Sequence, residues 1–242
     1  MKIRNVGNRI MNTWIYPVED GWAMIDTGYE NSYASVVKKL RNLLIQPEEI
    51  CYIFLTHAHD DHAGFLEEWM TKHPNTQVIA HEKAIDGLRQ GQNSFEGGCS
   101  SLLAFLFCQL MVLLGNGDHR YPKLRKEHLA EIITLNEDDR AQIETALNGK
   151  IFFTPGHTED SISLLVDGKL FCGDAAMNGI PSSHKITIWV ENKVAFEKSW
   201  DMILASGAKK LYPAHGKAFI PQLLTRNKHH IGEITLRPLK HK

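Results

Sequence analysis

Cysteine is scarce in this sequence, and its few copies show no pattern that would bind a metal or build a disulfide framework. Four cysteines occur among 242 residues, and no two of them form a CxxC pair. A disulfide framework is not expected in a cytosolic chain of this size. We expect buried thiols at all four positions, which are Cys51, Cys99, Cys108 and Cys172.

The chain also lacks an excess of charge of either sign. Its 27 Lys and Arg residues and 28 Asp and Glu residues give a formal net charge of −1. A chain that must hold nucleic acid or an anionic membrane surface usually carries a basic excess. We therefore expect a small-molecule substrate and no nucleic-acid partner.

Long hydrophobic runs are absent as well, and we expect no targeting segment. The longest mostly apolar stretch, 101–114, is shorter than the roughly 20 residues that cross a bilayer. The polar start, residues 1–5, is not followed by the short apolar core and cleavage site of a secretory signal. We expect no membrane span and a cytoplasmic location.

No internal repeat, low-complexity tract or Pro/Gly/Ser-rich linker divides the chain. Its composition, 43% hydrophobic and 23% charged, is that of a globular protein with a sizeable core. Short apolar runs alternate with helical patterns, which is typical of an α/β fold. We expect a single domain over residues 1–242 with a helical insertion at about 91–128.

Local patterns predict the positions of the main strands and helices. Strands are expected where short apolar runs end at turn-forming residues: 14–16, 22–25, 51–55, 77–80, 151–154, 162–166, 169–172, 186–190 and 210–212. Helices are expected where apolar side chains recur every three or four residues: 36–44, 65–72, 194–206 and 220–225.

The insertion contains a segment with apolar residues on every side of the helix it predicts. This segment, 101–114, carries Leu, Phe, Val, Met or Ala at most positions and is closed by Gly115. A helix that is apolar all round has to be buried all round. We expect it to lie in the core or to form the contact of a homodimer, in preference to a lid over an apolar substrate pocket.

The densest chemical signal is the stretch THAHDDHAG. Its four potential metal ligands are His57, His59, Asp61 and His62, directly after a predicted strand. Residues two apart in an extended chain point to the same side, so His57 and His59 can bind one cation together. Asp61 and His62 can then face a second cation. A stretch of this kind taken alone could also be a solvated turn.

Four further candidates stand just past the ends of other predicted strands: Asp26, His157, Asp174 and His215. Loops at the carboxyl ends of strands are where α/β proteins gather their functional sites. Five separate strand ends that all present His or Asp are hard to explain as coincidence. We therefore interpret the pattern as a metal site.

The donors suffice for two cations. Zinc accepts imidazole nitrogen and carboxylate oxygen, and a catalytic zinc keeps one position open for water. Metal pairs in such sites lie about 3.5–4 Å apart. We expect two divalent metal ions, with zinc ahead of iron or manganese. One cation takes His57, His59 and His157, the other takes Asp61, His62 and His215, and Asp174 can bridge the two.

These residues resemble the metallo-β-lactamase superfamily of metal hydrolases. The resemblance rests on HxHxDH at 57–62, TPGHT around His157, CGDA around Asp174 and PAHG around His215, with IDTG near the start. It implies an αββα sandwich with a dinuclear metal site at one edge. It also implies that Asp26, in the IDTG motif, steadies the site from behind the ligands rather than binding metal.

The expected reaction is hydrolysis by a water molecule that the metals activate near neutral pH. Asp61 is the candidate catalytic residue, placed to orient the nucleophile and to pass a proton to the leaving group. His184, in the loop after Asp174, is a candidate hydrogen-bond donor to the substrate.

Some residues of this chain differ from those typical of particular branches of the superfamily, and these differences restrict the expected class of substrate. The glyoxalase II branch holds glutathione with Lys or Arg beyond the bridging Asp, but the first cation after Asp174 here is Lys185. The acyl-homoserine lactonase branch has Tyr where this chain has Met177, and the β-lactamases proper have Cys where it has Asp174. An uncharged ester, thioester or lactone with an apolar acyl part fits best.

Three alternatives stay open on the sequence. Sulfur dioxygenases that resemble the superfamily hold a single iron and oxidise persulfides, and imidazole suits iron as well as zinc. A phosphodiesterase or nuclease is the second, although the near-neutral charge disfavours long nucleic acids. A binding protein without activity would be expected to lack one or more ligands, and none is missing here.

Overall fold

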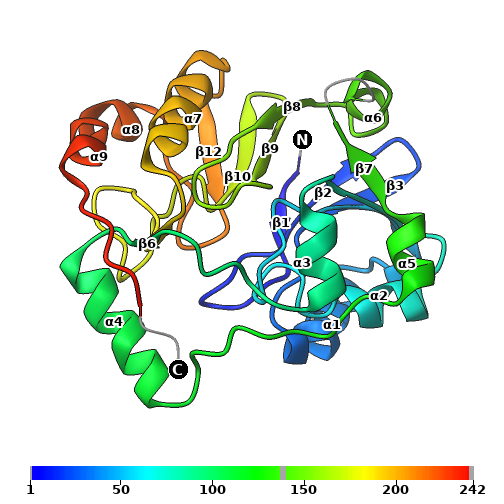
Figure 1. Ribbon diagram of the computed structural model, residues 1–242. Helices are drawn as coiled ribbons and strands as arrows, with labels where there is room; N and C mark the ends of the chain where they lie inside the picture. The colour runs from blue at the N-terminus through cyan, green and yellow to red at the C-terminus, as the bar shows by residue number, and fades with distance from the viewer. Residues whose placement is uncertain (1, 137–139, 240–242) are drawn as a thin grey trace. The chain divides into compact units, whose positions relative to one another are not determined.

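The computed structural model describes residues 2–136 and 140–239, and the chain divides into two compact units. The first unit comprises Met1–Asn93 and Arg120–Ile151, and the second comprises Ser94–His119 and Phe152–Lys242. The helical insertion expected at 91–128 is therefore shared, because only 94–119 belongs to the second unit. Figure 1 follows the chain through both units.

The framework of the first unit is a six-stranded sheet. Its strands are β1 (Arg4–Asn5), β2 (Trp14–Val18), β3 (Gly21–Ile25), β4 (Ile50–Phe54), β5 (Gln77–His81) and β7 (Ile133–Leu135), hydrogen-bonded in that order. β2 and β3 form an antiparallel hairpin. The strands β3, β4, β5 and β7 run parallel to one another. The carboxyl ends of β3 and β4 therefore lie at the same edge, where Asp26 and His57 follow them.

Helices of the first unit bury their apolar faces in one core with this sheet. The helices described are α1 (Tyr33–Asn42), α2 (Leu66–Lys72), α3 (Ala84–Gln90), α5 (Lys126–Glu131) and α6 (Arg140–Ala146), with 3₁₀ turns at Glu30–Ser32 and Pro47–Glu49. Leu40 of α1, Trp69 of α2 and Leu88 of α3 are fully buried in that core. Each such side chain stabilises the fold by about 1.5–3 kcal/mol, so the sheet edge is a rigid platform.

The second unit contains a four-stranded sheet. Its strands are β8 (Lys150–Phe153), β9 (Ile162–Val166), β10 (Lys169–Gly173) and β12 (Lys210–Pro213), in the order β12-β10-β9-β8. β9 and β10 form an antiparallel hairpin, and β10 runs parallel to β12. Asp174 and His215 follow these two parallel strands. A separate two-stranded sheet pairs β6 (Gly98–Cys99) with β11 (Trp189–Val190).

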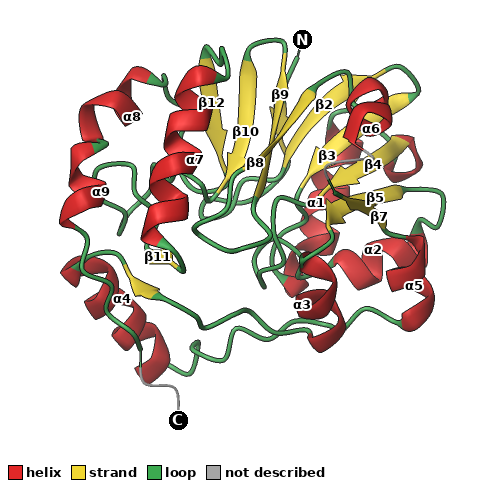
Figure 2. Cartoon of the chain, turned by 45° about the horizontal axis from the view of Figure 1, so that its top comes forward, coloured by secondary structure: helices red, strands yellow, loops and turns green. Residues whose placement is uncertain are grey.

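A second core lies between this sheet and the helices of its own unit. The helices described there are α4 (Leu102–Leu113), α7 (Lys193–Ala205), α8 (Gln222–Asn227) and α9 (His229–Glu233). Phe196, Trp200 and Ile203 of α7 are buried in this core with Leu170 and Leu211 from the sheet. Figure 2 shows α7 running alongside β10 and β12. Each unit thus supplies one sheet and its covering helices, the layers from which an αββα sandwich is composed.

Three expectations from the sequence are wrong. Buried thiols are expected at all four cysteines, but Cys51 and Cys108 are only partly buried. The strand expected at 186–190 is reduced to Trp189–Val190, because the preceding residues form irregular loop. The expectation that the apolar helix lies in the core also fails, since Ala104 is the single fully buried residue of α4. Within the ranges described, no helix combines the length and apolar character needed to cross a membrane.

Candidate metal centre

Asp26 is the centre of a buried hydrogen-bond network at the ends of β3 and β4. Its carboxylate accepts from the Thr56 amide (2.7 Å), the Thr56 hydroxyl (2.9 Å) and Nδ1 of His62 (2.9 Å). Because a carboxylate can only accept, Nδ1 of His62 carries the proton and Nε2 carries the lone pair. Asp26 therefore fixes both the tautomer and the orientation of this imidazole.

The loop after β4 gathers four candidate ligands within the first unit. The ring of His57 lies 4.6 Å from that of His59 and 3.8 Å from that of His62, measured between centroids. All three imidazoles are buried. Oδ1 of Asp61 lies 3.7 Å from Nε2 of His62. The structure thus brings these four sequence-predicted residues together.

Residues that the sequence analysis did not single out hold this loop in place. The side chain of Asn93 accepts from the Asp60 amide and donates to the Asp60 carboxylate, both at 2.7 Å. The Tyr121 hydroxyl donates to the carbonyl of Ala58 (3.0 Å). A Cβ at Gly64 would collide with the Asp60 carbonyl, so glycine is required where the loop closes. No sequence motif marks Asn93 or Tyr121, since both are distant in the chain.

In the second unit, three further candidates meet at one edge of the four-stranded sheet. His157, Asp174 and His215 follow β8, β10 and β12, and all three are buried. Nδ1 of His157 donates to the carbonyl of Trp189 (2.8 Å), which leaves the lone pair on Nε2. The amide of Ala214 donates to the carbonyl of Gly173 (3.0 Å) and ties the ends of β10 and β12 together.

The carboxylate of Asp174 lies between the two imidazoles of its unit. Its Oδ2 is 3.8 Å from Nε2 of His157, and its Oδ1 is 3.6 Å from Nε2 of His215. These separations are too long for hydrogen bonds. They suit donors that share a cation, because two ligands of a tetrahedral zinc, each at ~2.1 Å, lie ~3.4 Å apart. Asp174 therefore directs one oxygen toward each imidazole, an arrangement that would suit a carboxylate shared by two cations.

Glu191 clamps the segment that carries His157. Its amide donates to the carbonyl of Gly156 (2.9 Å), and its Oε2 accepts from the amide of Glu159 (2.9 Å). Burial raises the pKa of Glu191 to about 7, and the nearby charge of Asp160 adds to the increase. No sequence pattern predicts a carboxyl group with a pKa near neutrality at this position.

This clamp predicts a stability that falls as the pH rises. The unfolded chain releases the Glu191 proton near pH 4.5, whereas the folded chain keeps it until about pH 7. The folded state therefore loses stability between these values and none further above them. Because the side chain is only partly buried, we expect Glu191→Gln to recover about 1–2 kcal/mol of unfolding free energy at pH 8 and little at pH 4.

Urea unfolding of the metal-free protein at both pH values measures this effect. Glu131→Gln, at an exposed position of α5, is the control and should change stability equally at both pH values. An equal effect of Glu191→Gln at pH 4 and pH 8 would contradict the assignment.

His184 lies against the terminal helices of the second unit. Its ring stacks on that of His230 (centroids 3.6 Å apart), and its Nδ1 lies 3.3 Å from Oδ1 of Asn227. The side chain is exposed, and the backbone adopts a left-handed conformation with φ of 55°. Its expected contact with substrate stays a prediction.

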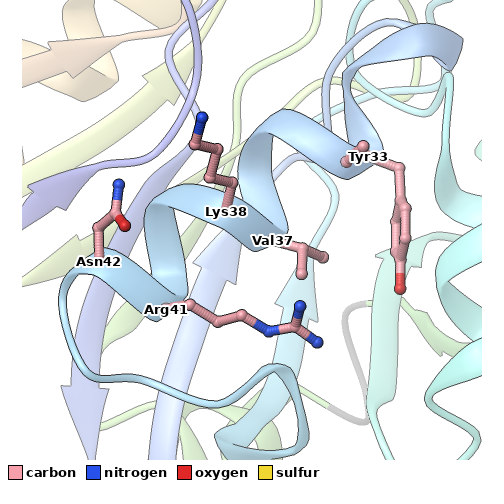
Figure 3. Close-up of a pocket in the computed structure, with 6 residues that line it drawn as sticks. Tyr33, Val37, Lys38, Arg41 and Asn42 are labelled. Atoms are coloured by element: carbon pink, nitrogen blue, oxygen red, sulfur yellow. The ribbon is translucent and has the colours of Figure 1, made fainter.

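One cavity of the first unit lies away from the candidate ligands. A hollow of about 450 Å³ runs along α1 in the first unit. Figure 3 shows it lined by Tyr33, Val37, Lys38, Arg41 and Asn42. All of its lining residues come from one helix, and none is a candidate ligand. We assign it no part in the chemistry.

The sequence matches the metallo-β-lactamase superfamily over residues 6–215. The chain belongs to this superfamily. The match covers the HxHxDH stretch and the segments that carry the later candidate ligands. The buried His and Asp groups are donors that could hold a metal ion, which agrees with membership of the superfamily.

Curated superfamily relatives are longer than this chain. The metallo-β-lactamase fold-containing protein ST1585 of Sulfurisphaera tokodaii is 29% identical over 174 residues, which are 65% of this chain and 54% of that protein. The nitric oxide reductase of Moorella thermoacetica is 31% identical over 72 residues, 30% of this chain and 18% of that protein. The chain therefore spans about half, or less, of the length of these curated relatives.

Solved structures of superfamily members confirm the expected fold class. The structure of ST1585 from Sulfolobus tokodaii has a TM-score of 0.61 at 21% identity and covers 96% of this chain and 85% of that chain. TTHA1623 in a di-iron-bound form has a TM-score of 0.64 at 17% identity and covers 94% of this chain and 98% of that chain. At these identities the likeness shows the fold alone.

Proposed function

We propose that the candidate ligands bind divalent cations and that the chain is a hydrolase of esters, thioesters or lactones. The observation that carries the proposal is the carboxylate of Asp174, with one oxygen toward His157 and the other toward His215. A carboxylate buried between two imidazoles is costly unless a cation compensates it. Membership of the superfamily supports metal binding by the candidate ligands.

The donor set fits divalent metal. Asp61 Oδ1 and His62 Nε2 are separated by 3.7 Å, again the spacing of neighbouring ligands. Cys172 supplies no thiolate, because it is buried in the core of the second unit and burial raises the pKa of its thiol. Nitrogen and oxygen donors alone suit zinc, iron or manganese. We propose zinc, and metal analysis decides between it and iron.

Two cations bound here would lower the pKa of a water molecule toward neutrality and polarise a substrate carbonyl. The chain's own residues would then orient the candidate ligands and transfer a proton to the leaving group. Asp61, which is partly exposed, accepts a proton from the attacking water and delivers it to the leaving group. Asp26 and the Trp189 carbonyl hold His62 and His157 in fixed orientations.

The loop after Asp174 supports an uncharged substrate. Lys185 is the first cation in the sequence after Asp174. Its ammonium group donates to Oδ1 of Asn178 and lies over the ring of Phe219. A cation that already has these partners is less available to clamp a carboxylate or phosphate. The loop therefore favours an ester, thioester or lactone over a phosphodiester or a glutathione conjugate.

Metal analysis combined with a substrate panel tests the proposal. The protein is purified without added metal, its zinc, iron and manganese are quantified, and hydrolysis of apolar acyl esters, thioesters, lactones and bis-p-nitrophenyl phosphate is measured. We expect two zinc ions per chain and turnover of one of the first three classes. One iron per chain with persulfide oxidation, or turnover of the phosphodiester alone, would refute it.

Asp61→Asn is expected to lower kcat by roughly 10²–10³-fold, because an amide cannot accept and return the proton. Metal binding by His57 and His59 should be largely retained. The kcat of this variant and its metal content report the two effects separately. Asp60→Asn, one residue earlier in the same loop, is the matched control and should stay near wild-type activity. Unchanged kcat in Asp61→Asn would remove this residue from the mechanism.

A further inference from the structure

The helix α4 exposes more apolar surface than any role inside the second unit explains. Its leucines are largely uncovered, with exposed fractions of 55% for Leu103, 56% for Leu106, 52% for Leu110 and 81% for Leu113. The helix is anchored from its other side, where Ala104 is buried and Cys108 hydrogen-bonds to Cys99 of β6. In Figures 1 and 2 it lies apart from the four-stranded sheet.

These four leucines form a single seam. Leu103, Leu106, Leu110 and Leu113 are spaced three, four and three residues apart. This is the a/d spacing by which two helices pack side by side, each side chain fitting between those of the partner helix. A 12-residue helix is about 18 Å long, so the seam runs over its whole length.

We infer that α4 is the interface of a homodimer, in which the leucine seam packs against the same seam of a second copy. With Leu102, Phe107 and Leu114, the exposed apolar side chains on this side of the helix leave on the order of 700 Å² uncovered. This exceeds the few hundred Å² that a monomer ordinarily leaves in one patch, and it approaches the ~800 Å² that each partner gives to a standard interface. A two-fold axis pairs one patch with itself, so no second surface is needed.

The charges around α4 favour a second copy over a membrane surface. Helices that lie in a membrane interface carry a strongly charged face, usually rich in Lys and Arg. α4 carries Gln109 as its most polar residue, and the segment 94–119 contains no Lys or Arg while it contains Glu96 and Asp118. Such a segment gains nothing from anionic lipid.

Charge reversal across the seam tests the dimer whether the helices pair parallel or antiparallel. One variant carries Leu106→Glu and Leu110→Glu, and a second carries Leu106→Lys and Leu110→Lys. Sedimentation velocity of the full chain should give wild type at twice the 27.4 kDa of one chain. Each variant alone should lose the dimer through like-charge repulsion, and an equimolar mixture of the two should recover it.

Val112→Glu is the matched control, since it places a charge on α4 outside the seam and should leave the dimer intact. Hydrogen exchange of the wild-type protein, measured above and below the dissociation constant of the dimer, needs no variant. The protection of the α4 amides should rise with protein concentration. A monomeric wild type, including one that floats with phosphatidylcholine–phosphatidylglycerol vesicles, would overturn the inference. So would a dimer that survives both charge pairs.

Discussion

Asp174→Asn is expected to reduce the metal content from two ions per chain to about one and to lower kcat/KM by roughly 10³-fold. The amide keeps one acceptor oxygen and replaces the other with a donor, so it cannot face both His157 and His215 as a ligand. Losing one cation removes several kcal/mol of transition-state stabilisation, and ~4 kcal/mol corresponds to that factor in rate. Inductively coupled plasma mass spectrometry and steady-state kinetics measure the two effects.

The control for this variant is Asp201→Asn, an exposed position of α7 in the same unit whose carboxylate pairs with Lys228. It should retain both metals and full activity. Retention of two metals by Asp174→Asn would show that this carboxylate does not bridge. Loss of activity with both metals retained would instead assign it a role in substrate binding.

The candidate ligands could be found from the sequence because local rules place them. Asp26, Asp174 and His215 each follow a short apolar run, and a strand in an α/β fold presents the residue after its carboxyl end at the sheet edge. The structure puts strands where those runs predicted them. Within each unit, the pairs Asp61 with His62 and Asp174 with His215 then lie at ligand spacing.

The partners that hold these ligands could not be found in this way. The contact between Asn93 and Asp60 and that between Trp189 and His157 join residues more than 30 positions apart. No local periodicity encodes such pairs. The raised pKa of Glu191 likewise depends on burial beside Asp160, which only the fold creates.

The sequence left two alternatives open for the surroundings of α4, for a physical reason. An apolar pattern predicts that a helix is buried, but it does not indicate whether the chain's own core or a partner covers it. Burial in the core was one solution, and the exposed fractions of Leu106 and Leu113 exclude it for a single chain. Of the two alternatives that the pattern left open, the homodimer contact is the one on which the proposed dimer rests.

Asp26→Ala is expected to destabilise the fold by about 3–5 kcal/mol and to weaken metal binding by roughly 10–100-fold. The change leaves the Thr56 amide, the Thr56 hydroxyl and the His62 ring N–H buried without their acceptor. Each unsatisfied donor costs about 1–3 kcal/mol, and the total stays at the low end of the sum because the Thr56 hydroxyl also lies 3.1 Å from Nδ1 of His57. Position 26 also has φ of 58°, where alanine is strained by about 1–2 kcal/mol. Loss of the orienting acceptor accounts for the metal effect.

Asp26→Asn separates the two contributions, because asparagine tolerates the left-handed backbone and keeps one acceptor for Thr56. It should recover more than half of the lost stability while metal affinity stays low, since an amide cannot satisfy Thr56 and His62 together. Urea unfolding of the metal-free protein and competitive zinc titration give the two readings. Asp60→Ala removes one hydrogen bond to Asn93 in the neighbouring loop and should cost only about 1 kcal/mol. If Asp26→Ala cost no more than this control, Asp26 would be neither a structural anchor nor the residue that positions His62.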